Sequence, residues 1–156
     1  MADTLLRSFR FQVALRKSSD GTALGDGAFQ ECSGLEVEMD VHEYQEGGNN
    51  DAIIRQVGRA KYNPLTLRRG MFFGDSGGLN RDLWDWIQGV VSGRRPVERY
   101  DGVVQVMSVG DTVVATWQFD RGVPQSLRGP ELNARTGEVA IEELQIAHEG
   151  LRLVES

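Results

Sequence analysis

His148 and Glu149 form the pair in this chain that most resembles a metal-dependent catalytic motif. In zinc proteases, two histidines one helical turn apart bind the metal and an adjacent glutamate acts as general base. No second histidine stands at that spacing from His148, and the apolar pattern around it is typical of a strand. His42 is the other histidine. The pattern therefore predicts no metal site, and a two-histidine site built from distant strands is the alternative.

The other reactive residue types lack the neighbours that catalysis needs. Cys32 has no evident activating base, so we expect it to be a packing residue. Gly25, Asp26 and Gly27 are a fragment of a dinucleotide-binding loop without its third glycine or a following helix. Glu142–Glu143 are adjacent carboxylates that a strand would point to opposite faces. We predict no catalytic residue, no cofactor and no enzymatic activity.

Composition restricts the class of protein further. The 156 residues carry 17 Lys and Arg against 23 Asp and Glu, a net charge of -6, which argues against a basic nucleic-acid-binding patch. A single cysteine cannot form an internal disulfide, and no apolar run approaches the ~20 residues of a membrane span. Met1–Leu6 has no signal-peptide pattern. We expect cytoplasmic synthesis, no membrane insertion and one domain over residues 1–156.

Period-2 alternation predicts strands in the first half. Phe9, Phe11, Val13 and Leu15 alternate with polar residues, and further extended runs follow at Ile53–Val57 and Leu65–Met71. Between them, four apolar residues alternate with four polar ones, so we expect one face of that strand in a core and the other in water: Leu35, Val37, Met39 and Val41 against Glu36, Glu38, Asp40 and His42. The Gly- and Asn-rich residues 46–52 predict a flexible loop.

One helix and a hairpin are predicted in the second half. Asn80 is a good N-cap, Asp82 favours the first turn, and Ser92–Gly93 with Pro96 should end the helix at about residue 92. Its apolar residues cover a broad face that could close the end of a barrel: Leu83, Trp84, Trp86, Ile87, Val90 and Val91. Gly102–Met107 and Thr112–Phe119 are two β-branched runs that predict a hairpin.

The last quarter holds a turn, Gly129–Ala134, and an irregular strand. Val139 and Ile141 stand at odd-numbered positions, and Leu144 and Ile146 stand at even-numbered ones, so a regular strand would point the two pairs to opposite faces. We expect a β-bulge or bend at Glu142–Glu143. Alternatively, the two faces of this strand are covered at different points, one by the chain and one by a neighbour.

The order and spacing of seven motifs are similar to the tail tube protein family of contractile phages and contractile injection systems. The resemblance runs from about Phe9 to Leu151 and includes Phe29–Val37, Glu46–Asn50, Leu67–Gly70, Leu83–Trp86, Trp117–Phe119, Gly129–Ala134 and Val139–Glu142. In relatives, a Pro-Lys combination often follows the Trp117 strand, whereas this chain keeps Pro124 without the lysine.

The resemblance implies a small β-barrel or sandwich with one flanking helix at about residues 80–92, as in the haemolysin co-regulated protein of type VI secretion. It implies hexameric rings stacked into a hollow inner tube, with strands from adjacent subunits continuing one large barrel around the lumen. The implied partners are other copies of the chain, a sheath protein, baseplate or spike proteins and a tube terminator. An effector protein or DNA would be cargo in the lumen, and the particle, a phage tail or injection device, can be released from the cell.

Two sets of residues are candidates for this role. Gly47, Gly48, Asn49 and Asn50 correspond to the loop that reaches a neighbouring ring or subunit, and Glu36, Glu38 and Asp40 would face the lumen. The alternatives are a flexible hairpin tip and a solvated strand face. A monomeric β-barrel ligand-binding module and a metal-dependent enzyme are the competing functions. The resemblance does not separate a main tube subunit from a baseplate-proximal paralogue.

Overall fold

The computed structural model describes residues 4–6, 10–24, 29–45, 53–71 and 79–154. Their secondary structure is mainly β with one helix, as the sequence predicted. The elements in chain order are β1 (Phe11–Lys17), β2 (Phe29–Ser33), β3 (Val37–Gln45), β4 (Ile53–Tyr62), β5 (Leu65–Gly70), α1 (Asp82–Val91), β6 (Tyr100–Met107), β7 (Val113–Arg128), β8 (Ile141–Ala147) and β9 (Gly150–Val154). None of the described helical segments is long and apolar enough to cross a membrane.

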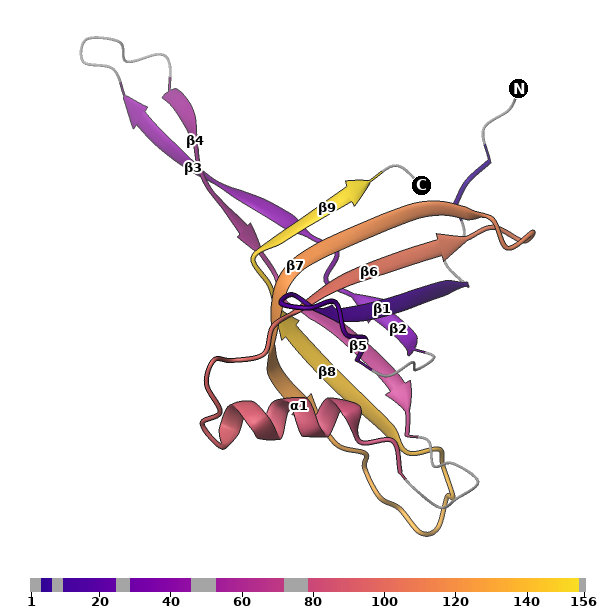
Figure 1. Ribbon diagram of the computed structural model, residues 1–156. Helices are drawn as coiled ribbons and strands as arrows, with labels where there is room; N and C mark the ends of the chain where they lie inside the picture. The colour runs from indigo at the N-terminus through magenta and orange to yellow at the C-terminus, as the bar shows by residue number, and fades with distance from the viewer. Residues whose placement is uncertain (1–3, 7–9, 25–28, 46–52, 72–78, 155–156) are drawn as a thin grey trace.

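A seven-stranded antiparallel sheet folds over on itself at β7 to give two layers (Figure 1). The strand order is β1-β6-β7-β8-β5-β2, and β9 pairs with β7 off this path. The first layer contains β1, β6, β9 and the part of β7 up to Gly122. The second layer contains β2, β5, β8 and residues 123–128 of β7. One continuous strand of 16 residues therefore belongs to both layers.

The two layers enclose the hydrophobic core. Its buried members come from both layers and from α1: Leu15, Leu65, Leu67, Leu83, Trp86, Tyr100, Val104, Phe119, Leu144 and Ile146. The predicted alternation in the first strand is confirmed from Phe11 on, because Phe11, Val13 and Leu15 turn toward this core, while Phe9 lies outside the described residues. Gly102 lies directly against the Phe119 ring, where a Cβ atom would stand 2.0 Å from two ring carbons.

The hairpin of β3 and β4 projects away from the two layers (Figure 1). Its strands pair with each other and form a separate two-stranded sheet. The expectation that Val37, Met39 and Val41 face the core is wrong, because all three side chains are about half exposed. Leu35, which precedes the strand, does pack against the core, whereas Val37, Met39 and Val41 have no cover within the described chain. The predicted flexible loop at 46–52 lies outside the described residues.

Helix α1 closes one end of the space between the layers. Leu83 and Trp86 are buried, and the Trp86 ring meets Tyr100 of β6 edge-on at 4.6 Å between centroids. The prediction that Asn80 is the N-cap is wrong, because Arg81 occupies that position without a side-chain capping hydrogen bond; Asn80, one residue earlier, accepts the Asp82 N–H on its Oδ1 at 3.2 Å. The prediction for Val91 is wrong. That side chain is 81% exposed at the last turn.

The expected bulge at Glu142–Glu143 is absent from β8. This strand pairs with β5 in one unbroken register from Ile141 to Ile146, and Glu142 occupies a buried position between Leu144 and the start of the strand. The change of parity in the sequence arises because a carboxylate, not an apolar residue, fills that core position. The register shift lies in the partner strand, between Pro124 and Ser126 of β7.

Candidate assembly surfaces

The β3–β4 arm, residues 37–45 and 53–62, carries an apolar strip on one face. Val41 lies opposite Val57 and Met39 lies opposite Ala60, so that these side chains share a face. Exposure of the large members ranges from 45% at Met39 to 72% at Val57. Contiguous exposed apolar groups on a projecting element mark interaction sites, because their burial against a partner releases water from nonpolar surface.

The opposite face of the arm carries two of the three predicted lumen residues. Glu38 lies across from Lys61, and the Lys61 Nζ lies 2.9 Å from Asp40 Oδ1. The hydrogen bond to Asp40 raises the Lys61 pKa. Glu36 stands before β3 and accepts a hydrogen bond from the Asn63 side-chain amide. The structure thus gathers Glu38 and Asp40 around one lysine, which partly neutralises the acidic face.

A buried ion pair fixes the helix to the second layer. The Arg69 Nε lies 2.7 Å from Glu142 Oε1, and both side chains are 1% exposed. The other carboxylate oxygen of Glu142 accepts the Trp84 indole N–H at 3.0 Å. The Arg69 guanidinium also lies over the Phe29 ring of β2, at 5.4 Å from its centroid. Sequence reasoning missed this cluster because its two charges are 73 positions apart along the chain.

His148 lies at the base of the arm, between two aromatic rings. Its ring stands 5.4 Å from the Tyr62 ring of β4 and 5.6 Å from the Phe119 ring. Burial lowers the pKa of His148, although the backbone of Asn63 and Gly150 and the charge of Asp120 favour the protonated form. His42 lies out on the arm beside Gly58. Among the described residues, no three His, Cys, Asp or Glu side chains are grouped as metal ligands.

Cys32 does not have the character of a nucleophile. The side chain is half-buried in β2 and packs against the core. Burial raises the pKa of its thiol to about 11. A thiol with that pKa stays protonated at neutral pH, whereas cysteine nucleophiles react as thiolates.

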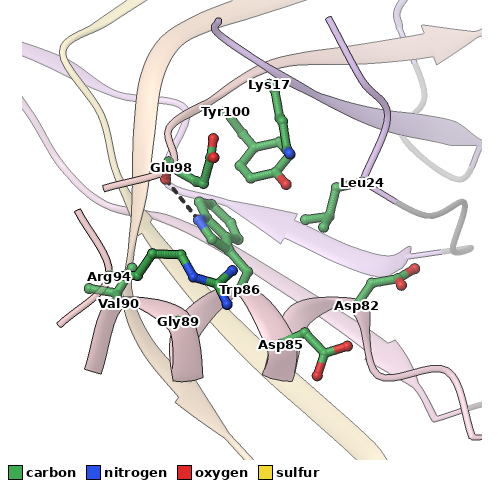
Figure 2. Close-up of a pocket in the computed structure, with 10 residues that line it drawn as sticks. All are labelled: Lys17, Leu24, Asp82, Asp85, Trp86, Gly89, Val90, Arg94, Glu98 and Tyr100. Atoms are coloured by element: carbon green, nitrogen blue, oxygen red, sulfur yellow. Dashed lines mark hydrogen bonds between the residues drawn. The ribbon is translucent and has the colours of Figure 1, made fainter. Parts of the chain in front are cut away.

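A small hollow lies between α1 and the strands β1 and β6 (Figure 2). Its volume is about 190 Å³, below the roughly 300–1,000 Å³ of typical ligand sites. Charged side chains of both signs surround the Trp86 ring, whose N–H donates to the Glu98 carbonyl at 2.9 Å. The charged side chains are those of Lys17 on β1, Asp82 and Asp85 on α1, and Arg94 and Glu98 in the segment between α1 and β6. This arrangement gives no support to a catalytic centre.

The outer face of the second layer is polar and ordered in rows. One row runs across all four strands with alternating charge, from Glu31 through Arg68 and Glu143 to Arg128. Arg68 lies 3.2 Å from Glu31 and 4.0 Å from Glu143, and Arg128 lies 3.7 Å from Glu143. The next row is neutral and contains Ser33, Thr66, Gln145 and Ser126. Since cross-strand pairing creates these rows, no local pattern in the sequence reveals them.

Comparison with protein families matches residues 7–152 to the model of the T4-like virus tail tube protein gp19. The match spans nearly the whole chain. The chain belongs to the tail tube family. The family resemblance seen in the sequence motifs is therefore confirmed, and the family is one of structural tube proteins.

Solved structures show the same tail tube fold at low sequence identity. A chain in the six-fold symmetrised baseplate of the anti-feeding prophage is 23% identical, with a TM-score of 0.81 over 99% of this chain and 98% of that one. A chain in the extended sheath–tube complex of the PVC extracellular contractile injection system is 23% identical, with a TM-score of 0.75 and coverage of 97% and 93%. Hcp1 from Flavobacterium johnsoniae is 10% identical, with a TM-score of 0.51 and coverage of 93% and 96%.

The search of curated proteins gave no significant match. The structural comparisons confirm the fold class of this tail tube protein, which is mainly β with one flanking helix. Its structural neighbours are chains of contractile injection systems and Hcp proteins.

Proposed function

We propose that this tail tube protein is the subunit of a hollow inner tube, in which six copies form a ring and rings stack along an axis. The apolar strip of the arm carries the proposal, because Val37, Met39, Val41 and Val57 have no cover in the described part of the chain. A second copy would cover them. Membership of the tail tube family and the six-fold symmetry of the similar baseplate structure support this arrangement.

The arm would make the contact between neighbouring subunits or rings. The predicted contact residues Gly47, Gly48, Asn49 and Asn50 come between Gln45 of β3 and Ile53 of β4 in the sequence and lie outside the described residues. Because glycine has no side chain, Gly47 and Gly48 would let the backbone approach another subunit closely.

The mechanism is mechanical and not catalytic. A contracting sheath would drive the rigid tube through a target envelope, and the baseplate and a terminator would fix its two ends. Similar chains occur in structures of a baseplate, a sheath–tube complex and a tube-terminating cap, which supports these partners. The tube would be made in the cytoplasm, act in a phage tail or a released particle, and hold DNA or an effector protein as cargo. Glu36, Glu38 and Asp40 remain a predicted surface for that cargo.

Electron microscopy and light scattering of the purified protein test the proposal. We expect rings or tubes, and a strong loss of assembly for Val41→Asp or Val57→Asp, since each puts a charge into the apolar strip. Gln56→Asp is the matched control, because Gln56 is exposed on the opposite face of the same strand. A protein that stays monomeric under all conditions, even with sheath and baseplate partners present, would overturn the proposed function.

A further inference from the structure

His148 is a buried titratable group at the junction between the arm and the two layers. Its ring lies between Tyr62, the last residue of β4, and Phe119 of β7, at 5.4 and 5.6 Å between centroids. Both ring nitrogens are buried, and neither has a hydrogen-bond partner among the described residues. Buried polar atoms are normally hydrogen-bonded, so this ring is an exception of the kind that often has a functional reason.

The arm is joined to the two layers by two short links that lie against each other. One link runs from Gly34 to Glu36, and the other consists of Asn63 and Pro64. Gly34 has a positive φ, and a Cβ atom there would clash with the Pro64 carbonyl oxygen. The Asn63 side-chain amide donates to the Glu36 carboxylate. Because β3 and β4 pair only with each other among the described strands, these links and the ring contact at His148 set the orientation of the arm.

The two rings that hold His148 differ in how easily they can move. Phe119 is fully buried and belongs to the core that both layers share. Tyr62 is only partly buried and belongs to the arm. Exposing His148 on the Phe119 side would require the layers to separate, whereas on the Tyr62 side it requires only that the base of the arm move. The local opening of lowest cost therefore carries Tyr62 away from His148.

The surroundings of His148 favour its neutral form. Burial lowers the pKa of His148 from the ordinary value of 6.5. The backbone of Gly150 and Asn63 and the charge of Asp120 favour the protonated ring, but their combined effect is smaller than that of burial. A protonated ring carries a charge and two N–H donors, so protonation in place would bury that charge. Proton uptake consequently favours any state in which the ring reaches water.

The charged side chains on the elements around His148 are paired with one another. On β4 the titratable group that faces the ring is Tyr62, and the neighbouring Lys61 points to the opposite face of the strand. The carboxylates nearest to the ring in the chain and on β7 are Glu149 and Asp120. The ion pairs of these elements are Asp120–Arg152, Glu149–Arg121, Glu149–Arg99 and Lys61–Asp40. His148 therefore has no dedicated counter-charge within the described chain.

We propose that His148 is a proton-sensitive switch for the orientation of the arm. The neutral ring packs between Tyr62 and Phe119 and holds the arm as in Figure 1, whereas the protonated ring releases it from the two layers. The sign follows from the lowered pKa, because the closed arm binds the proton less readily than the released arm. Release is thus favoured as pH falls from 6.5 toward the closed-state pKa. In that range one proton is taken up, and the equilibrium shifts by up to about tenfold for each pH unit.

The switch also has a consequence for assembly, and this part rests on the proposed tube function. The apolar strip of the arm can meet another copy only in the orientation that the base of the arm allows. Release of the base turns the strip away from that orientation, so assembly should weaken under acidic conditions. The switch of the free subunit does not depend on the tube.

Distances between spin labels on the arm and on the layers test the switch in the free subunit. The labels are attached to Gln56→Cys on β4 and Asp85→Cys on α1, which are both exposed, in a Cys32→Ala background. Below the assembly concentration, pulsed electron paramagnetic resonance should give one narrow distance distribution at about pH 8 and an additional broad one at about pH 5. His148→Phe keeps an aromatic ring without a titrating group and should stay narrow at both pH values. Tyr62→Ala removes the arm side of the contact and should be broad at both.

Three outcomes of this measurement would overturn the switch. A distribution that stays narrow at both pH values shows that protonation does not move the arm. An equal change in His148→Phe assigns the effect to another group. Loss of the sheet signal in circular dichroism together with the distance change shows that the whole subunit unfolds.

Nuclear magnetic resonance measures the titration of His148 directly. A His42→Gln background leaves His148 as the single histidine of the chain. Its ring signals should titrate below pH 6.5, and Tyr62→Ala should raise the pKa toward 6.5, since the ring then reaches water. A titration at or above pH 6.5 with Tyr62 in place would overturn the switch, and so would an unchanged pKa in Tyr62→Ala.

Assembly measurements separate the switch from the tube function. Light scattering should show that the critical assembly concentration of the wild type rises as pH falls below 6.5, by at most about tenfold for each pH unit, and His148→Phe should lose most of this rise. An equal rise in both proteins would overturn the link between the switch and assembly. A protein without rings at any pH would overturn the tube function, while the distances in the free subunit would still decide on the switch.

Discussion

Removal of the Glu142 carboxylate should destabilise the protein more than any other single charge change in the second layer. The side chain is 1% exposed, pairs with the equally buried Arg69 at 2.7 Å and accepts the Trp84 N–H. Glu142→Leu conserves approximate volume but leaves the guanidinium without its counter-charge. Among the described residues Arg69 Nη1 and Nη2 have no hydrogen-bond partner, and the guanidinium meets Glu142 through Nε.

The expected loss follows from the cost of an uncompensated buried charge. Breaking a buried ion pair from one side typically costs about 3–5 kcal/mol. That is at least about a fifth of the roughly 5–15 kcal/mol that stabilises an ordinary domain. For a chain of this size the melting temperature should fall by about 6–20 °C, at about 2–4 °C for each kcal/mol.

Urea unfolding followed by tryptophan fluorescence measures this loss, because Trp84 reports on the cluster directly. Protein at a concentration below assembly keeps the measurement on the monomer. Glu143→Gln is the matched control, since Glu143 is the next residue of β8, is partly exposed and pairs with Arg68 and Arg128 at 4.0 and 3.7 Å. It should change the free energy of unfolding by less than about 1 kcal/mol.

The double variant Arg69→Met, Glu142→Leu discriminates between explanations. If the uncompensated charge causes the loss, removing both charges should recover most of the stability. The reasoning is refuted if Glu142→Leu costs less than about 1 kcal/mol. It is also refuted if the double variant is as unstable as the single one, since lost packing would then explain the effect.

Four other changes test separate features. Gly102→Ala should lower the free energy of unfolding in urea by about 1–3 kcal/mol, because the added Cβ would stand 2.0 Å from the Phe119 ring. Gly110→Ala is the control and should lower it less, since a Cβ there meets no heavy atom within 4 Å. Equal losses in the two variants would contradict the role given to packing against Phe119. Burial lowers the His148 pKa, so the contribution of neutral His148 to stability should be complete above pH 6.5 and should decline as the pH falls from 6.5 toward the folded-state pKa. His148→Phe should remove this part of the pH dependence of the free energy of unfolding. An unchanged pH dependence in the variant would disprove the assignment to His148. Charge reversal at Glu36, Glu38 and Asp40 together should alter cargo loading more than folding, while unchanged loading in intact tubes would remove that face from the lumen. Gly48→Val should hinder ring stacking, and tubes of normal length would count against the loop contact.

Alternation in the sequence located most strands because it records which side chains face the core. It succeeded where the chain supplies its own cover, as at Phe11–Leu15 and in the alternating buried positions Leu65 and Leu67. It failed at Val37–Val41, where the same pattern faces outward on the arm. Periodicity reports that a face is to be buried, but not which molecule buries it.

Long-range pairing accounts for the remaining errors. The parity change near Glu142 looked like a bulge, because the sequence cannot show that Arg69 supplies a partner for a carboxylate in the core. The alternating charge row was invisible for the same reason, since Glu31 and Arg68 are brought together only by the β2–β5 register. The contact and lumen residues named from the sequence stay predictions, whereas the polar rows of the second layer could be found only from the sheet topology.

The continuity of β7 bears on how the subunit can come apart. Because one strand supplies hydrogen bonds to β6 and β9 and then to β8, neither layer can lose this strand without exposing the other. The two layers should therefore melt in a single cooperative step, with no intermediate in which one survives alone. In a tube exposed to sudden force, this coupling means that a damaged subunit unfolds as a whole and does not lose one layer while it keeps the other.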